Sequence, residues 1–129
     1  MSPFEMVWNT FEFHTNQINT LEREHLSNIA QYQDFVASVI NPTRKERLLL
    51  KKQIDGCCSK LITEYKKQID CIDEMVDGVQ NNSFETEEDI EILNSFEIDW
   101  DHILQLKNLT ATLMKEMIQV KSKINEVLS

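Results

Sequence analysis

The hydrophobic residues of this chain recur every three or four positions over three long stretches, which is the spacing of amphipathic helices. The first stretch begins at Phe4 and continues through Val7, Phe11, Ile18, Leu21, Tyr32, Phe35 and Val39. The second contains Ile54, Cys58, Leu61, Tyr65, Ile72 and Met75, and the third continues from Ile103 to Val127. The pattern predicts helices over about 3–40, 44–78 and 87–128, with a loop over about 79–86.

Helix starts are marked by a hydroxyl residue followed three positions later by an acid, the spacing of a capping box. This spacing occurs at Ser2–Glu5 and Thr43–Glu46. A third start signal is Thr86-Glu87-Glu88-Asp89, with acids in its first turn. Asn41-Pro42 separates the first two helices, because proline restricts the residue before it. Asp99 can cap a further helix. We therefore expect the third helix either to be continuous or to break near 97–99 after a short helix.

The chain has few turn residues, with only 2 glycines and 2 prolines among 129 residues. This composition favours a single all-α domain. Short connections make neighbouring helices antiparallel. We expect an elongated up-down-up antiparallel three-helix bundle, and a helical hairpin completed by dimerisation is the alternative. Polar residues inside the apolar repeats do not decide between these two architectures, because such residues occur in monomer cores and in oligomers. They are His14, His25, Asn28 and Gln68.

Charge is distributed unevenly along the chain, whose net value is −9. Eight basic and three acidic residues lie between Arg44 and Lys67, whereas twelve acids and no Lys or Arg lie between Gln68 and Asp101. The second predicted helix thus has basic residues near its N-terminus and acidic residues near its C-terminus, the arrangement that the helix macrodipole disfavours. In an antiparallel fold the acids converge at one end, where we expect a basic protein partner to bind. The candidate contacts are Glu87, Glu88, Asp89 and Glu91, expected to be the most exposed, with Asp73 and Asp77.

A second set of apolar residues lies off the main repeats. These residues are candidates for a second, apolar interface in a homo- or hetero-oligomer: Phe13, Leu49, Leu50 and Ile92.

No catalytic, cofactor-binding or metal-binding motif is present in the sequence. His14 and His25 would lie about 16 Å apart along one helix, too far to share a metal ion. The group Asp99-Trp100-Asp101-His102 is explained by a cap and a core residue, and Cys57-Cys58 lacks the spacing of a metal or redox site. We therefore expect a protein that is not an enzyme and needs no cofactor.

Three long helices of this size resemble the N-terminal three-helix domains of syntaxins, spectrin repeats and BAR-type bundles. The nearest resemblance is to F-BAR helices, over Val7-Trp8, Glu24-His25-Leu26 and Arg44-Lys45. This resemblance implies a membrane-trafficking module. The chain departs from the F-BAR pattern because it is shorter and acidic, whereas an F-BAR domain presents a basic concave face.

The function expected from these features is a non-enzymatic interaction module, a scaffold or adaptor subunit acting through helix–helix contacts. The alternative is a membrane-trafficking module of the syntaxin or BAR type. A nucleic-acid accessory subunit is third, because the basic stretch Arg44–Lys52 is short and lacks interleaved aromatic residues. The sequence has no signal-peptide pattern and no long apolar run, which predicts an intracellular protein. The expected compartment is the cytoplasm, and the nucleus is also compatible with the sequence.

Overall fold

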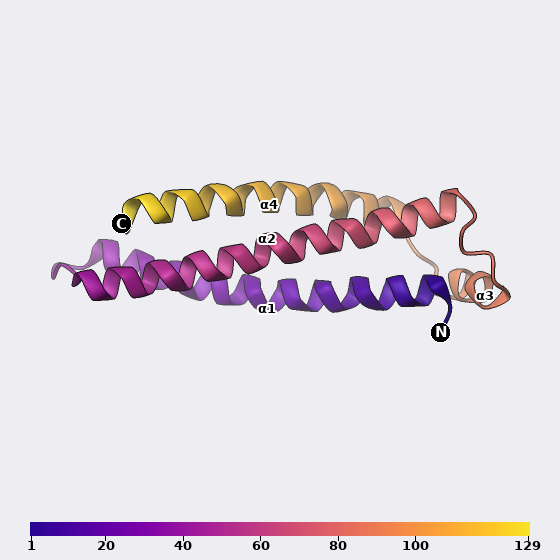
Figure 1. Ribbon diagram of the computed structural model, residues 1–129, viewed down its shortest axis with the longest axis horizontal. Helices are drawn as coiled ribbons and strands as arrows, with labels where there is room; N and C mark the ends of the chain where they lie inside the picture. Colours follow the sequence, from indigo (N-terminus) through magenta and orange to yellow (C-terminus); the bar gives the residue numbers. More distant parts are fainter.

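The computed structural model describes all 129 residues and contains four helices and no strand, with 85 % of the chain helical. The helices are α1 (Pro3–Ala37), α2 (Arg44–Gln80), α3 (Glu87–Phe96) and α4 (Trp100–Val127). Figure 1 shows a long bundle in which α2 lies between α1 and α4 and runs in the opposite direction to both. Helix α3 is a short separate element at the end where α1 begins. None of the helices carries an apolar stretch long enough to cross a membrane.

The helix starts follow the predicted capping pattern. At α2 the capping box is complete, since the Glu46 amide donates to Thr43 Oγ1 at 3.2 Å and the Thr43 amide donates to the Glu46 carboxylate at 3.0 Å. At α1 only half of the box forms, with the Glu5 amide donating to Ser2 Oγ at 3.1 Å. Helix α1 ends at Ala37, before the expected end near residue 40, which leaves Val39 outside the helix.

The third predicted helix is broken, so the continuous alternative and the count of three helices are wrong. Glu97 adopts a left-handed conformation with φ 47°, which ends α3. Asp99 then caps α4, accepting a hydrogen bond from the His102 amide at 3.1 Å. The break has a packing reason, because α3 packs against α1 whereas α4 packs against α2.

The core consists of two hydrophobic clusters on either side of a polar layer. One cluster joins the first half of α2 to α1 and α4, with members including Ile18, Leu21, Leu50, Ile54, Leu61, Met117 and Ile124. The other lies toward α3 and includes Phe4, Phe11, Cys71, Ile72, Met75 and Ile103. Helix α2 supplies 11 buried residues, against 5 from α1 and 4 from α4. It is therefore the central element of the bundle.

Gln68 forms the polar layer between the two clusters. Its amide nitrogen donates to Thr15 Oγ1 on α1 at 2.9 Å, and its amide oxygen accepts from Thr110 Oγ1 on α4 at 2.8 Å. Because both polar ends of this buried side chain need a partner, sliding any of the three long helices by one turn would leave Gln68 unsatisfied. This layer therefore fixes the register of α1, α2 and α4.

Candidate functional site

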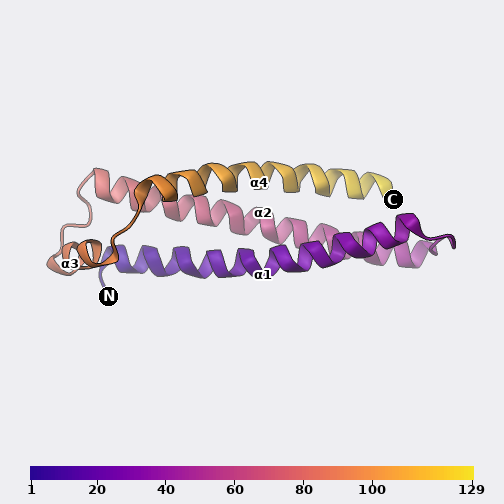
Figure 2. The ribbon, with the colours of Figure 1, turned by 180° about the vertical axis from the view of Figure 1, so that it is seen from behind.

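Acidic residues are concentrated in the end of α2, the loop after it, α3 and the start of α4. These segments lie at the same end of the bundle (Figures 1 and 2). We call the exposed acids here the acidic end: Asp70, Glu74, Asp77, Glu85, Glu87, Glu88, Glu91, Glu97, Asp99 and Asp101. An open pocket of about 520 Å³ lies among them, lined by Asp70, Glu74, Asp77 and Phe84 together with Asp73. No Lys or Arg is part of its lining.

Of the candidate acids, Glu87, Glu88 and Glu91 are exposed as predicted, and Asp77 is exposed too. Asp73 has a more limited role, because it is half-buried and forms an ion pair with Lys107 of α4. The charge of Asp73 is thus compensated within the molecule, whereas the four exposed acids form no ion pair.

Asp89 was expected to be among the most exposed acids, and this prediction is wrong. Its side chain is fully buried, and Oδ1 accepts a hydrogen bond from the Phe4 amide at 3.0 Å. Burial alone would raise the pKa of Asp89, but hydrogen bonds from Thr86, Ser2 and the Phe4 amide outweigh it and hold the pKa below its ordinary value. The ionised carboxylate therefore ties α3 to the positive N-terminal end of α1.

Aromatic rings reinforce this attachment between α3, its preceding loop and α1. The ring centroid of Phe4 lies 5.3 Å from that of Phe84 and 6.1 Å from that of Phe96. The ring of Phe84 occupies the space above Gly78, where a Cβ atom would lie 2.1 Å from it. The loop and α3 are therefore packed onto the bundle, and the exposed acids stand on a fixed surface.

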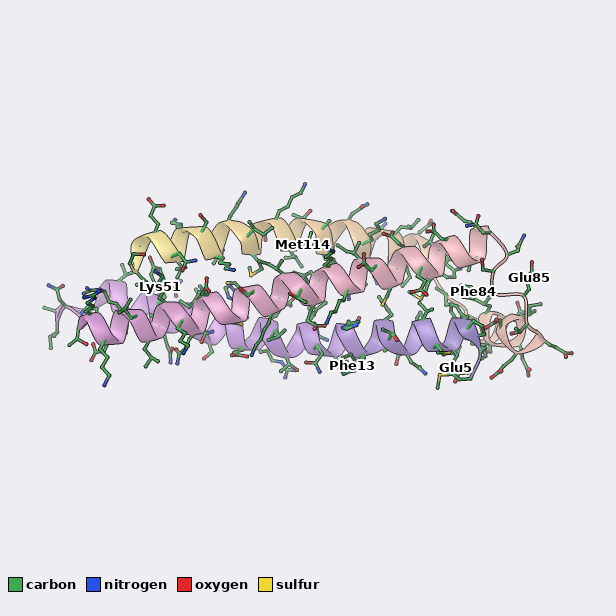
Figure 3. The ribbon with its side chains drawn as sticks, in the orientation of Figure 1. Glu5, Phe13, Lys51, Phe84, Glu85 and Met114 are labelled. Carbon is green, nitrogen blue, oxygen red and sulfur yellow. The ribbon has the colours of Figure 1, made fainter.

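The four candidates for a second apolar interface separate into three groups. Phe13 and Leu49 are exposed, at 55 % and 58 % of their full surface, and Figure 3 shows Phe13 on the outer side of α1. Ile92 is half-buried against the second cluster. Leu50 is a core residue, only 4 % exposed, so its placement outside the core was wrong. It lies four residues before Ile54, in the same apolar repeat.

His14, His25, Cys57 and Cys58 lie in contacts between α1 and α2. His14 Nδ1 pairs with Glu64 at 2.5 Å, between α1 and α2. His25 Nδ1 lies 3.8 Å from Cys58 Sγ, but burial lowers the pKa of the imidazole and raises that of the thiol. Both groups are thus held neutral, unlike the ion pair of a nucleophilic cysteine. Burial also raises the pKa of Cys57 to about 11, and no three potential ligands are grouped to hold a metal ion.

A second surface lies at the opposite end, around the connection between α1 and α2, where the basic stretch counted in the sequence stands beside exposed apolar residues. We call it the basic tip, and it consists of the exposed residues Val39, Ile40, Lys45, Leu48, Leu49 and Lys52. Val39 and Ile40 immediately precede Asn41-Pro42. Because proline disfavours a helical conformation in the residue before it, Pro42 was the sequence signal that could have placed these two residues outside the helix. Figure 3 places neighbouring Lys51 and the acidic end's Glu85 at opposite ends of the bundle.

No protein-family model, curated protein sequence or solved structure matches this chain. The residues of the acidic end and of the basic tip are therefore the basis for the proposals that follow.

Proposed function

We propose that this protein is a non-enzymatic interaction module, a scaffold or adaptor subunit, whose acidic end binds a basic protein partner. The observation that carries the proposal is that exposed acids without ion-pair partners are concentrated at one end of the bundle, on α2, the loop after it, α3 and the start of α4, with a pocket on α2 among them. Three of them, Asp70, Glu74 and Asp77, line the pocket from α2. Phe84 is the apolar residue of the lining. The pocket therefore offers acids to the charge of an approaching Lys or Arg and an aromatic side chain to its aliphatic stem.

The electrostatics of this end support capture of a cation-rich partner. The only basic side chain that pairs with an acid here is Lys107, and it is occupied by Asp73. Charges that lack internal partners act on the surrounding solution up to about a Debye length, roughly 10 Å at 0.1 M salt. A basic partner should therefore associate faster at low salt than at high salt.

We further propose that α1, α2 and α4 form a complete three-helix core in the monomer. The polar layer at Gln68 supports this, because its two hydrogen-bond partners both come from the same chain. The alternative, a hairpin completed by a second copy, predicts a mass that rises with concentration in sedimentation equilibrium. A concentration-independent monomer mass would exclude that alternative.

The acidic end is tested by replacing three exposed glutamates, Glu87→Gln, Glu88→Gln and Glu91→Gln, in one variant. Asp89 is left intact because it is structural. The matched control removes the same charge from exposed positions elsewhere, Glu24→Gln, Glu116→Gln and Glu126→Gln. We expect pull-down from cell lysate to lose salt-sensitive partners only with the first variant, while circular dichroism stays unchanged. Equal partner sets for both variants would refute the proposal.

A further inference from the structure

The basic tip exposes apolar side chains that have no partner in the molecule. Val39 is 101 % exposed and Ile40 is 81 % exposed, both in the connection after α1. Leu48 and Leu49, in the second turn of α2, are also exposed. An exposed isoleucine or leucine alone is ordinary, but four exposed apolar residues near one end of the bundle are an unusual concentration.

Positive charge lies on the same surface. Lys45, Leu48, Leu49 and Lys52 follow the spacing of one helix face, at positions i, i+3, i+4 and i+7 of α2. Neither lysine makes a hydrogen bond or an ion pair, and the same is true of Arg44 at the start of the helix and of Lys60 and Lys66 further along it.

The acids of this segment, in contrast, each have a partner inside the molecule. Glu46 is held in the capping box, Asp55 accepts from Asn125 at 2.9 Å, and Glu64 is paired with His14. The outward face of the first part of α2 is consequently a surface of unpaired cations with exposed leucines between them.

We infer that the basic tip docks on an anionic lipid bilayer. Val39 and Ile40 would enter the headgroup region, while Lys45 and Lys52 lie at the lipid phosphates. The charge of the tip complements an anionic surface, and its two most exposed apolar residues, Val39 and Ile40, lie in the connection between α1 and α2, where they can enter a bilayer. Two acids, Asp34 and Glu46, line a pocket of about 370 Å³ beside Leu49, but the eight basic residues between Arg44 and Lys67 outnumber them.

The remote position of the acidic end makes this docking compatible with a net charge of −9. Helix α2 has 37 residues, and a helix of this length spans about 55 Å. The acids therefore lie several Debye lengths from a bilayer that contacts the tip. Repulsion of the acidic end would favour a molecule standing on the membrane by its tip, with that end free in solution. The docking is independent of the partner proposed for the acidic end.

The binding test is sedimentation with vesicles of phosphatidylcholine alone or mixed with phosphatidylserine. We expect the protein to pellet only with the mixed vesicles and to be released at high salt. Each lysine near an anionic surface is worth about fivefold in affinity, so Lys45→Gln with Lys52→Gln should weaken binding by more than tenfold. Val39→Ser with Ile40→Ser should also weaken it, and neither pair alters the core because all four side chains are exposed.

Matched controls on α4 separate the tip from general charge and hydrophobicity. Lys115→Gln with Lys123→Gln removes the same charge, and Leu109→Ser with Ile118→Ser replaces two apolar side chains that are 55 % and 51 % exposed. These two variants should pellet like the wild type. Equal losses in the tip and control variants would overturn the inference, as would the absence of any binding to phosphatidylserine vesicles. Binding of polyglutamate at the tip without vesicle binding would assign an acidic protein instead.

The orientation is tested with an environment-sensitive dye on an introduced cysteine. The native cysteines are buried, so a thiol at the surface reacts selectively. A dye on Val39→Cys should shift its emission to the blue with phosphatidylserine vesicles, whereas a dye on Glu87→Cys at the acidic end should not. A shift at Glu87→Cys alone, or at both positions, would overturn docking through the tip.

Discussion

Replacing the buried carboxylate of Asp89 tests how α3 and the acidic end are held on the bundle. Asp89→Ala removes the acceptor of the Phe4 amide, and a buried donor left unsatisfied costs about 1–3 kcal/mol. It also removes a negative charge from the N-terminus of α1, worth up to about 2 kcal/mol in a partly buried site. Because the two terms overlap, we expect the free energy of unfolding to fall by about 2–4 kcal/mol.

Urea unfolding followed by circular dichroism measures this loss. Asp89→Asn keeps an oxygen that can accept from the Phe4 amide, so it should lose only the charge term, about 1–2 kcal/mol. The control is Glu88→Ala, one position away and exposed, which should change stability by no more than about 0.5 kcal/mol. Equal urea midpoints for Asp89→Ala and Glu88→Ala would refute the role given to this carboxylate.

The same carboxylate predicts a pH dependence. The pKa of Asp89 in the folded protein is lower than its ordinary value, so folding favours the ionised form. Its stabilisation is therefore fully present above the ordinary pKa of an aspartate and is lost as the pH falls through the lowered value. The stability difference between wild type and Asp89→Asn should be constant near neutral pH and should shrink in acid. A difference that grows in acid would contradict this sign.

Two further pairs of variants test the core and the glycines by thermal or urea unfolding. Leu50→Ala should lower the free energy of unfolding by about 2–5 kcal/mol because the side chain is buried. Leu49→Ala should lower it by no more than about 0.5 kcal/mol. Similar losses for the two variants would show that Leu50 is not in the core. Gly78→Ala should destabilise by about 1–3 kcal/mol because its Cβ would displace the ring of Phe84. A Cβ atom at Gly56 would meet open space, so Gly56→Ala should stabilise α2 by about 1 kcal/mol. If Gly78→Ala were also more stable than the wild type, the ring of Phe84 would not be packed against Gly78.

Helix content and helix starts were readable from the sequence because they depend on local signals. Thr43 and Glu46 form their capping box within four residues, and the apolar repeat of α2 needs only the helix period. The break before α4 was less certain, since Asp99 can cap a helix or continue one. It is decided by Glu97, whose left-handed backbone lets α3 turn onto α1, and this packing involves residues far apart in the sequence.

Asp89 and Leu50 were misplaced for different physical reasons. The partner of Asp89 is the amide of Phe4, 85 residues away, and no local pattern identifies such a pair. Thr86 and the acids after it did indicate a helix start, but this signal is the same whether the side chain of Asp89 is exposed or buried. Leu50 could have been placed correctly, because extending the repeat of Ile54 by four residues toward the N-terminus reaches it.

The charge arrangement of α2 leads to a last prediction. Its first turns carry cations and its last turns carry acids, with no basic residue in the last turn, so both ends oppose the macrodipole. Exchanging one charge at each end, with Lys45→Glu and Asp77→Lys in one variant, leaves the net charge unchanged and should raise the free energy of unfolding by about 0.5–2 kcal/mol. The same variant should bind phosphatidylserine vesicles and basic partners less well, since one residue comes from each surface. Stability gained together with binding lost would mean that the chain keeps these charges for contacts outside itself. A variant that is less stable than the wild type would instead assign Lys45 and Asp77 a role in folding, and both surfaces would lose their physical argument.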